Sequence, residues 1–137
     1  MTPLFLFKIY LMKSRFILFI PAVLCFAVTF FLLTIPGNHL PKIDWMGKYQ
    51  VDKLVHISMF FSLCFLFSYP IKNLVEKYKW LIYITIAGIF YGIAMEFVQK
   101  YFIPFRSFEV NDMIADGIGC TVNYWWWRRK FAKLKAV

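Results

Sequence analysis

Four apolar segments, separated by short polar stretches, recur along the chain. They span residues 16–35, 54–71, 80–98 and 110–127. The first contains twenty residues without a charge, which as a helix would be about 30 Å long, enough to cross the hydrocarbon core of a bilayer. The second ends near Pro70, and the third carries one acid, Glu96, close to its end. The pattern therefore predicts an all-α protein, an integral membrane bundle of four transmembrane helices.

The fourth segment is the least apolar of the four. It contains Asp112 and Asp116 in its first two turns, and an Asp at the centre of a bilayer costs about 2.5–3.5 kcal/mol on insertion scales. The distribution of positive charge nevertheless favours a crossing. If all four segments cross, eleven of the 16 Lys and Arg residues lie on the side that holds both ends of the chain. The positive-inside rule then predicts that both termini are cytoplasmic.

Composition agrees with a multi-pass protein of a cell membrane. The 137-residue chain is 61% hydrophobic and 22% aromatic, with a mean hydropathy of +0.63, whereas soluble domains are nearer half apolar. The net charge of +9 would suit nucleic acid, but the basic residues cluster between apolar segments without an RNA-binding signature, so no nucleic-acid partner is expected. Cys25, Cys64 and Cys120 lie within apolar segments and form no CxxC pair, which favours buried apolar side chains over a disulfide framework or a zinc site.

The same pattern divides the chain into three parts. Residues 1–15 form a cytoplasmic N-terminal leader, residues 16–127 the transmembrane domain, and residues 128–137 a basic cytoplasmic tail. The first apolar segment is longer than the core of a signal peptide, so we expect a permanent anchor. The sequence leaves open whether Met1 or Met12 is the true start, because residues from Met12 onward already supply a basic flank before the anchor.

Polar and charged residues gather at the outer ends of three of the four segments. These residues, here called the polar cluster, are Asp52, Lys53, His56, Glu96, Gln99, Arg106, Glu109, Asp112 and Asp116. Asp52 and His56 are four residues apart, as are Asp112 and Asp116, so each pair lies on one helix face. We therefore expect an extracytoplasmic cluster to which three helices contribute.

Two blocks of these residues resemble the VanZ-like family of small bacterial membrane proteins. The first block is DKLVH at 52–56. The second is E-x-x-Q from Glu96, followed by R-x-x-acid-x-x-D-x-x-x-(N/D)-x-x-G from Arg106 to Gly119. Asp116 stands where members often have Asn, so a charge replaces an amide. The resemblance covers residues 16–127 and implies a multi-pass bundle in the bacterial cytoplasmic membrane, in a family whose named member is linked to low-level teicoplanin resistance.

The polar cluster is open to more than one interpretation. Arg106 or Lys53 could pair with the carboxylates and simply lock the helix ends together. We favour recognition of a lipid-linked or cell-envelope headgroup, in which Arg106 donates to a phosphate or carboxylate. The alternative is a small membrane-embedded enzyme, in which His56 and a carboxylate perform acid–base chemistry or hold a divalent metal, on an envelope or lipid substrate. No internal repeat favours a transporter, and the sequence assigns no catalytic residue, metal or cofactor.

Two specific contacts are expected. Arg106 is the only Arg on the predicted outer side, so we expect it to lie between Glu96 and Asp112 as an ion triad. Gly88 and Gly92 form a small-xxx-small surface, and we expect it to pack against residues 117–119. A homo-oligomer is compatible with the sequence.

Overall fold

A computed structural model describes residues 16–39 and 51–135 of the chain. Within these residues it contains four α-helices, one short 3₁₀-helix and no strand, which confirms the predicted all-helical class. The elements are α2 (Ile20–Thr34), η1 (Gly37–His39), α4 (Val51–Ser68), α5 (Lys77–Phe102) and α6 (Val110–Lys135). The leader at 1–15, the choice between Met1 and Met12, and the loop at 40–50 lie outside the described residues.

Prolines set several of the helix boundaries. Pro21 lies in the first turn of α2, where its missing N–H removes no intrahelical hydrogen bond. α4 ends two residues before Pro70 and α5 ends two residues before Pro104, because proline cannot continue the backbone ladder and disfavours helical dihedrals in the residue before it. α5 and α6 each have 26 residues, a length of about 39 Å at the usual helical rise.

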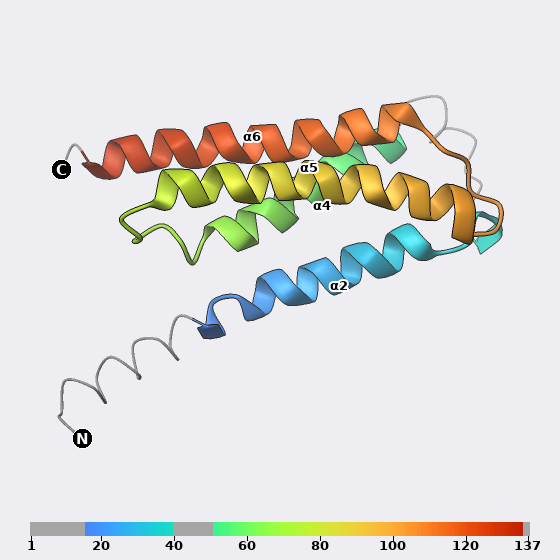
Figure 1. The fold of residues 1–137 in the computed structure, drawn as a ribbon, viewed down its shortest axis with the longest axis horizontal. Helices are drawn as coiled ribbons and strands as arrows, with labels where there is room; N and C mark the ends of the chain where they lie inside the picture. Colours follow the sequence, from blue (N-terminus) through green and yellow to red (C-terminus); the bar gives the residue numbers. More distant parts are fainter. Residues whose placement is uncertain (1–15, 40–50, 136–137) are drawn as a thin grey trace, which may run out of the picture.

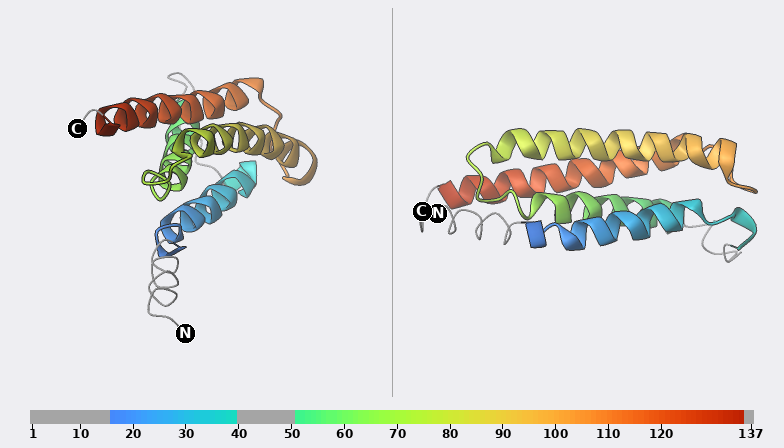
Figure 2. Two further views of the ribbon diagram at one scale, coloured as in Figure 1. Left: turned by 60° about the vertical axis from the view of Figure 1, so that its left-hand side comes forward. Right: turned by 60° about the horizontal axis from the view of Figure 1, so that its bottom comes forward.

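The chain reverses direction at each connection, so the helices alternate up and down (Figure 1). α6 packs most extensively against α4 and next against α5, while α2 packs against α4 and, less extensively, α5 (Figure 2). The start of α2 and the end of α6 therefore lie at the same end of the bundle. We call this end the basic end. The opposite end, where α4 and α6 begin and α2 and α5 finish, is the cluster end.

This bundle buries several polar and charged residues beside its apolar core, and it exposes many large apolar ones. The buried residues include His56, Glu96, Gln99, Asp116 and Asn123. Large apolar side chains, in contrast, are exposed along all four helices, and soluble monomers rarely expose so continuous an apolar surface. Two helices, α4 and α5, are long and apolar enough to cross a membrane, whereas α2 is an apolar helix of only 15 residues.

The glycines on α5 contact α6, although not at the expected residues. A Cβ added to Gly92 would lie 2.7 Å from Oδ2 of Asp116, and one added to Gly88 would lie 2.8 Å from Sγ of Cys120. Gly119 instead faces α4, where an added Cβ would lie 2.5 Å from the carbonyl oxygen of Ile57. A Cβ on Gly117 would have no neighbour within 4 Å. The prediction was right about the α5 face and wrong about residues 117–119 as its partner.

Candidate functional site

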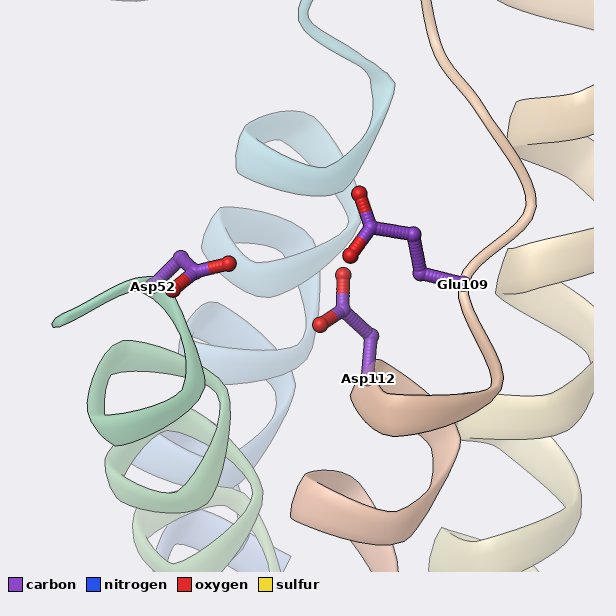
Figure 3. Close-up of side chains that lie close together, drawn as sticks. All are labelled: Asp52, Glu109 and Asp112. Atoms are coloured by element: carbon purple, nitrogen blue, oxygen red, sulfur yellow. The ribbon is translucent and has the colours of Figure 1, made fainter. Parts of the chain in front are cut away.

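Lys53 is the cation that joins α4 to the start of α6. Its Nζ lies 2.9 Å from Oδ2 of Asp52 and 2.8 Å from Oε2 of Glu109, and it forms a close ion pair with Oδ1 of Asp112. Figure 3 shows how these three carboxylates converge from α4, from the loop before α6 and from α6 itself. The Lys53 side chain is only 15% exposed, so one largely buried ammonium group faces three carboxylates.

His56 lies one turn deeper, between two carboxylates of α6. Its Nδ1 is 2.8 Å from Oδ1 of Asp116, and its Nε2 is 3.6 Å from Oδ2 of Asp112. All three residues are buried. The i,i+4 spacing of the two aspartates places them on the face of α6 that looks toward α4, so both ring nitrogens of His56 face acidic oxygens.

Glu96 connects the end of α5 to the start of α6. It is 1% exposed, and its Oε2 accepts a hydrogen bond of 2.9 Å from the backbone N–H of Glu109, the residue that precedes α6. The first N–H groups of a helix lack intrahelical partners, so a carboxylate at this position is stabilised by them and by the helix dipole. The three helix ends expected to form the polar cluster therefore do meet.

Two members of the polar cluster hold α2 instead of joining the carboxylates. Nε2 of Gln99 donates to the carbonyl oxygen of Leu33 at 2.9 Å, and Nε of Arg106 donates to that of Ile35 at 3.2 Å. The last carbonyls of a helix have no intrahelical donor and attract cationic groups. The side chains of the 99–106 stretch therefore attach the end of α2 to the rest of the cluster end.

The expected ion triad of Glu96, Arg106 and Asp112 is wrong. Within the part of the chain that the structure describes, Arg106 forms no ion pair, because its guanidinium is turned toward the end of α2. Lys53 occupies the position among the carboxylates that sequence reasoning had assigned to Arg106. The sequence also allows Lys53 as the partner of the carboxylates, and this alternative matches the geometry.

The backbone of α2 is the contribution that sequence reasoning missed. Its carbonyl groups at Leu33 and Ile35 accept the hydrogen bonds from Gln99 and Arg106, and no side-chain pattern in the apolar α2 sequence could have indicated this. The thiols of Cys64 and Cys120 also lie 3.5 Å apart inside the bundle. Both belong to the buried interior, whereas Cys25 is only partly buried.

Asp52, Glu109 and Asp112 also have the ligand type that hard cations prefer. Each offers one oxygen, and the three oxygens lie within 4.8 Å of one another (Figure 3). Calcium takes six to eight oxygen ligands and magnesium six, and the Lys53 ammonium already lies among these three oxygens. A divalent ion would have to displace Lys53, so the geometry alone does not make this a metal centre.

The polar cluster carries more acid than base. Its five carboxylates are Asp52, Glu96, Glu109, Asp112 and Asp116, and its basic groups are Lys53, His56 and Arg106. Glu96, Asp112 and Asp116 are at most 7% exposed, whereas Asp52 and Glu109 are exposed at the rim. The cluster can therefore accept hydrogen bonds from hydroxyl, amide or ammonium donors, and His56 can carry a proton between two carboxylates.

Comparison with known proteins identifies one uncharacterized relative. The chain is 31% identical over 88 residues to an uncharacterized protein of Schizosaccharomyces pombe. The match covers 61% of this chain and 53% of the relative, so the chain spans about half the length of the relative it matches. No family model matches the chain. No solved structure matches it either.

Proposed function

We propose that this chain is a multi-pass membrane protein of the VanZ-like type whose polar cluster binds the headgroup of a lipid-linked or cell-envelope molecule. In this proposal all four helices cross the cytoplasmic membrane of a bacterial cell, and both termini are cytoplasmic. The apolar exterior, the alternating helix directions and the excess of Lys and Arg at the basic end support it. An effect on glycopeptide susceptibility belongs to the same proposal, by family resemblance.

Convergence of the two motif blocks supports the family part of the proposal. The DKLVH block and the block from Glu96 to Gly119 are separated by 39 residues in the sequence. They nevertheless come into direct contact through Lys53 with Asp112 and through His56 with Asp116. The relative described above is fungal and uncharacterized, so bacterial origin rests on the motif alone.

The excess of buried carboxylate is the observation that carries the binding proposal. A purely structural lock between helices needs matched charges, and polar contacts between membrane helices contribute only about 0.6 kcal/mol each on average. Placing two aspartates of α6 in the bilayer region costs more free energy than a few such contacts contribute. Ionisable groups within membrane segments are by default functional, and the missing positive charge or hydrogen-bond donors would come from the ligand.

The balance of groups also indicates the kind of headgroup. The buried carboxylates of Glu96 and Asp116 can accept from sugar hydroxyls, amides or an ammonium group, but they repel a bare phosphate. The terminal nitrogens of Arg106 form no hydrogen bond or ion pair with any described residue. They can donate to a phosphate at the rim of the cluster. A headgroup that combines a phosphate with hydroxyl or amine groups is complementary both to the buried carboxylates and to Arg106.

Native mass spectrometry of the detergent-extracted protein tests the proposal. Glu96→Gln removes a buried charge but keeps an oxygen that can accept from the N–H of Glu109. We expect a copurifying molecule on the wild-type protein and its loss from Glu96→Gln, with little change in melting temperature. The matched control is Glu76→Gln, which alters an exposed acid at the basic end that is paired with Lys79. Equal retention by both variants would overturn the binding proposal.

The geometry of His56 favours the enzyme as a second candidate. An imidazole oriented by a carboxylate at Nδ1 can act as a general acid–base group through Nε2, which lies 3.6 Å from Oδ2 of Asp112 and is not held by a hydrogen bond. If the protein is an enzyme, His56→Gln should accumulate unreacted substrate, so the copurifying mass should differ from that of the wild type. If the protein only binds the headgroup, the wild type and His56→Gln should carry the same mass.

A further inference from the structure

A cleft lies at the basic end, far along the bundle from the polar cluster. It has a volume of about 320 Å³ and is bounded by the end of α4, the α4–α5 loop and the last turns of α6. Lys72 and Asn73 reach it from the loop, and Trp127 and Lys130 reach it from α6. Side chains of α4, of the loop that follows it and of α6 thus converge on one space.

The lysines that line this cleft have no acidic partner among the described residues. Glu76 is the one acid that the structure describes at this end, and its Oε1 already accepts an ion pair of 2.7 Å from Lys79. Nζ of Lys72 lies 3.8 Å from the centre of the Tyr69 ring, and Nζ of Lys130 lies 4.9 Å from that of Trp126. Aromatic faces hold these ammonium groups in place without neutralising them.

Trp127 brings a buried donor without a partner to the wall of the same cleft. The residue is 2% exposed and lines the cleft, yet its indole N–H has no acceptor among the described residues. A buried donor without a partner costs about 1–3 kcal/mol. Buried donors are therefore normally satisfied by protein, by water or by a bound molecule. An oxygen of a bound headgroup would satisfy this N–H if the ring turned it toward the cleft.

A hollow on the neighbouring face of α6 extends the positive surface. It has a volume of about 520 Å³ and shares Trp126 and Lys130 with the cleft. Arg129 and Lys133 also line it. Neither residue forms an ion pair with any residue that the structure describes. The cleft and the hollow together present four cations that form no ion pair with a described residue, and tryptophans lie between them.

We propose that the cleft at the basic end binds the headgroup phosphate of an anionic phospholipid from the adjoining leaflet. Basic pockets between transmembrane helices on the cytoplasmic side are suited to anionic headgroups, and tryptophans are enriched at this depth of a bilayer. The phosphate lies between Lys72 and Lys130, where the oxygens of the headgroup can also accept from Asn73 and Trp127. This inference rests on the membrane placement proposed above, but not on any ligand of the polar cluster.

Lipid retention by the full chain tests the site. The protein is extracted in detergent and mixed with phosphatidylglycerol or phosphatidylcholine, and bound lipid is measured by native mass spectrometry. We expect selective retention of phosphatidylglycerol by the wild type. Each positive charge near an anionic surface is worth about fivefold in affinity, so Lys72→Gln with Lys130→Gln should weaken retention roughly 25-fold. Lys79→Gln is the matched control, because Lys79 lies at the same end but is already paired with Glu76.

Two further comparisons separate the proposal from its alternatives. Trp127→Phe keeps an aromatic ring but removes the N–H, so it should lower phosphatidylglycerol retention, whereas Trp126→Phe should leave it within twofold. Equal retention of the two lipids by the wild type, or full retention by the double lysine variant, would overturn the site. Complete displacement of the lipid by millimolar inorganic phosphate would show that the cleft is a simple anion site. This result would also overturn the lipid assignment.

The outcome is also distinguishable from failure of the proposed function. The double lysine variant should still carry the molecule that copurifies with the polar cluster, and Glu96→Gln should still retain phosphatidylglycerol. Membrane fractionation of the expressed protein checks the shared assumption separately. A chain recovered in the soluble fraction would contradict both proposals at once.

Discussion

Oδ1 of Asp116 on α6 lies 2.8 Å from Nδ1 of His56 on α4, although the two residues are sixty positions apart in the sequence. Gly92 on α5 lies against the same aspartate, where any side chain would collide with its carboxylate. Three helices therefore meet at this pair. The contact between His56 and Asp116 requires that position 92 of α5 has no side chain and that Asp116 faces α4. A change at any one of the three positions therefore affects the other two.

The first prediction concerns Asp116. Asp116→Ala leaves the buried Nδ1 of His56 without its partner, and we expect a loss of about 1–3 kcal/mol in the free energy of unfolding. Asp116→Asn keeps an oxygen acceptor of the same shape, so most of that stability should remain. Thermal unfolding in detergent measures both. The control is Asp52→Ala at the exposed rim, and equal losses for Asp52→Ala and Asp116→Ala would contradict the central role of the pair.

The second prediction concerns Lys53. Lys53→Met leaves the carboxylates of Glu109 and Asp112 close together without their cation. We expect a loss of about 3 kcal/mol, the low end of the range for breaking a buried pair, because Glu109 is half-exposed. Combining Lys53→Met with Glu109→Gln and Asp112→Asn should restore most of the stability, since no unpaired buried charge then remains among the three.

The triple variant also separates a structural lock from a ligand site. If these residues serve a ligand, the variant should fold with a melting temperature close to that of the wild type and should fail to retain the copurifying molecule. Arg106→Met is a useful companion, because Arg106 pairs with the end of α2 and not with the carboxylates. A triple variant that folds and still binds like the wild type would leave only the structural role.

The third prediction uses two glycines that are two residues apart on α6. An added Cβ at Gly119 would lie 2.5 Å from the backbone oxygen of Ile57, whereas one at Gly117 would meet nothing within 4 Å. Gly119→Ala should therefore lower stability by about 1–3 kcal/mol through overpacking. Gly117→Ala should be neutral or raise stability by up to about 1 kcal/mol, because alanine is the better helix former. Equal melting temperatures for the two variants would contradict the packing of α6 on α4.

The fourth prediction concerns topology. Reporter fusions after Ile71 and after Val137 should report a cytoplasmic location, and a fusion after Arg106 should report an extracytoplasmic one, because the basic end carries most of the positive charge. This experiment decides whether α2 and α6 cross the membrane. Among the described helices, length and composition make α4 and α5 the candidate membrane spans. A fusion after Val137 that reports outside would show that α6 does not cross.

Helix positions could be predicted more closely than helix lengths. The segment expected at 54–71 is α4 at Val51–Ser68. It begins earlier because the helix includes Lys53, which pairs with α6 and with the loop before it. The segment expected to end at residue 127 continues in α6 to Lys135. Hydropathy shows where the apolar stretch of a helix ends. The helix itself can continue past that point with exposed Arg and Lys side chains.

The sequence by itself determined that the protein is helical and which polar residues form its cluster end, because apolar periodicity and charge position depend on local order along the chain. Only the tertiary structure decided their partners. Lys53 takes the place expected for Arg106, and Asp116 and Cys120 take the place expected for residues 117–119. These choices depend on how each helix is rotated about its axis and on backbone carbonyls at the end of α2. Neither property can be predicted from the pattern of side chains along a single helix.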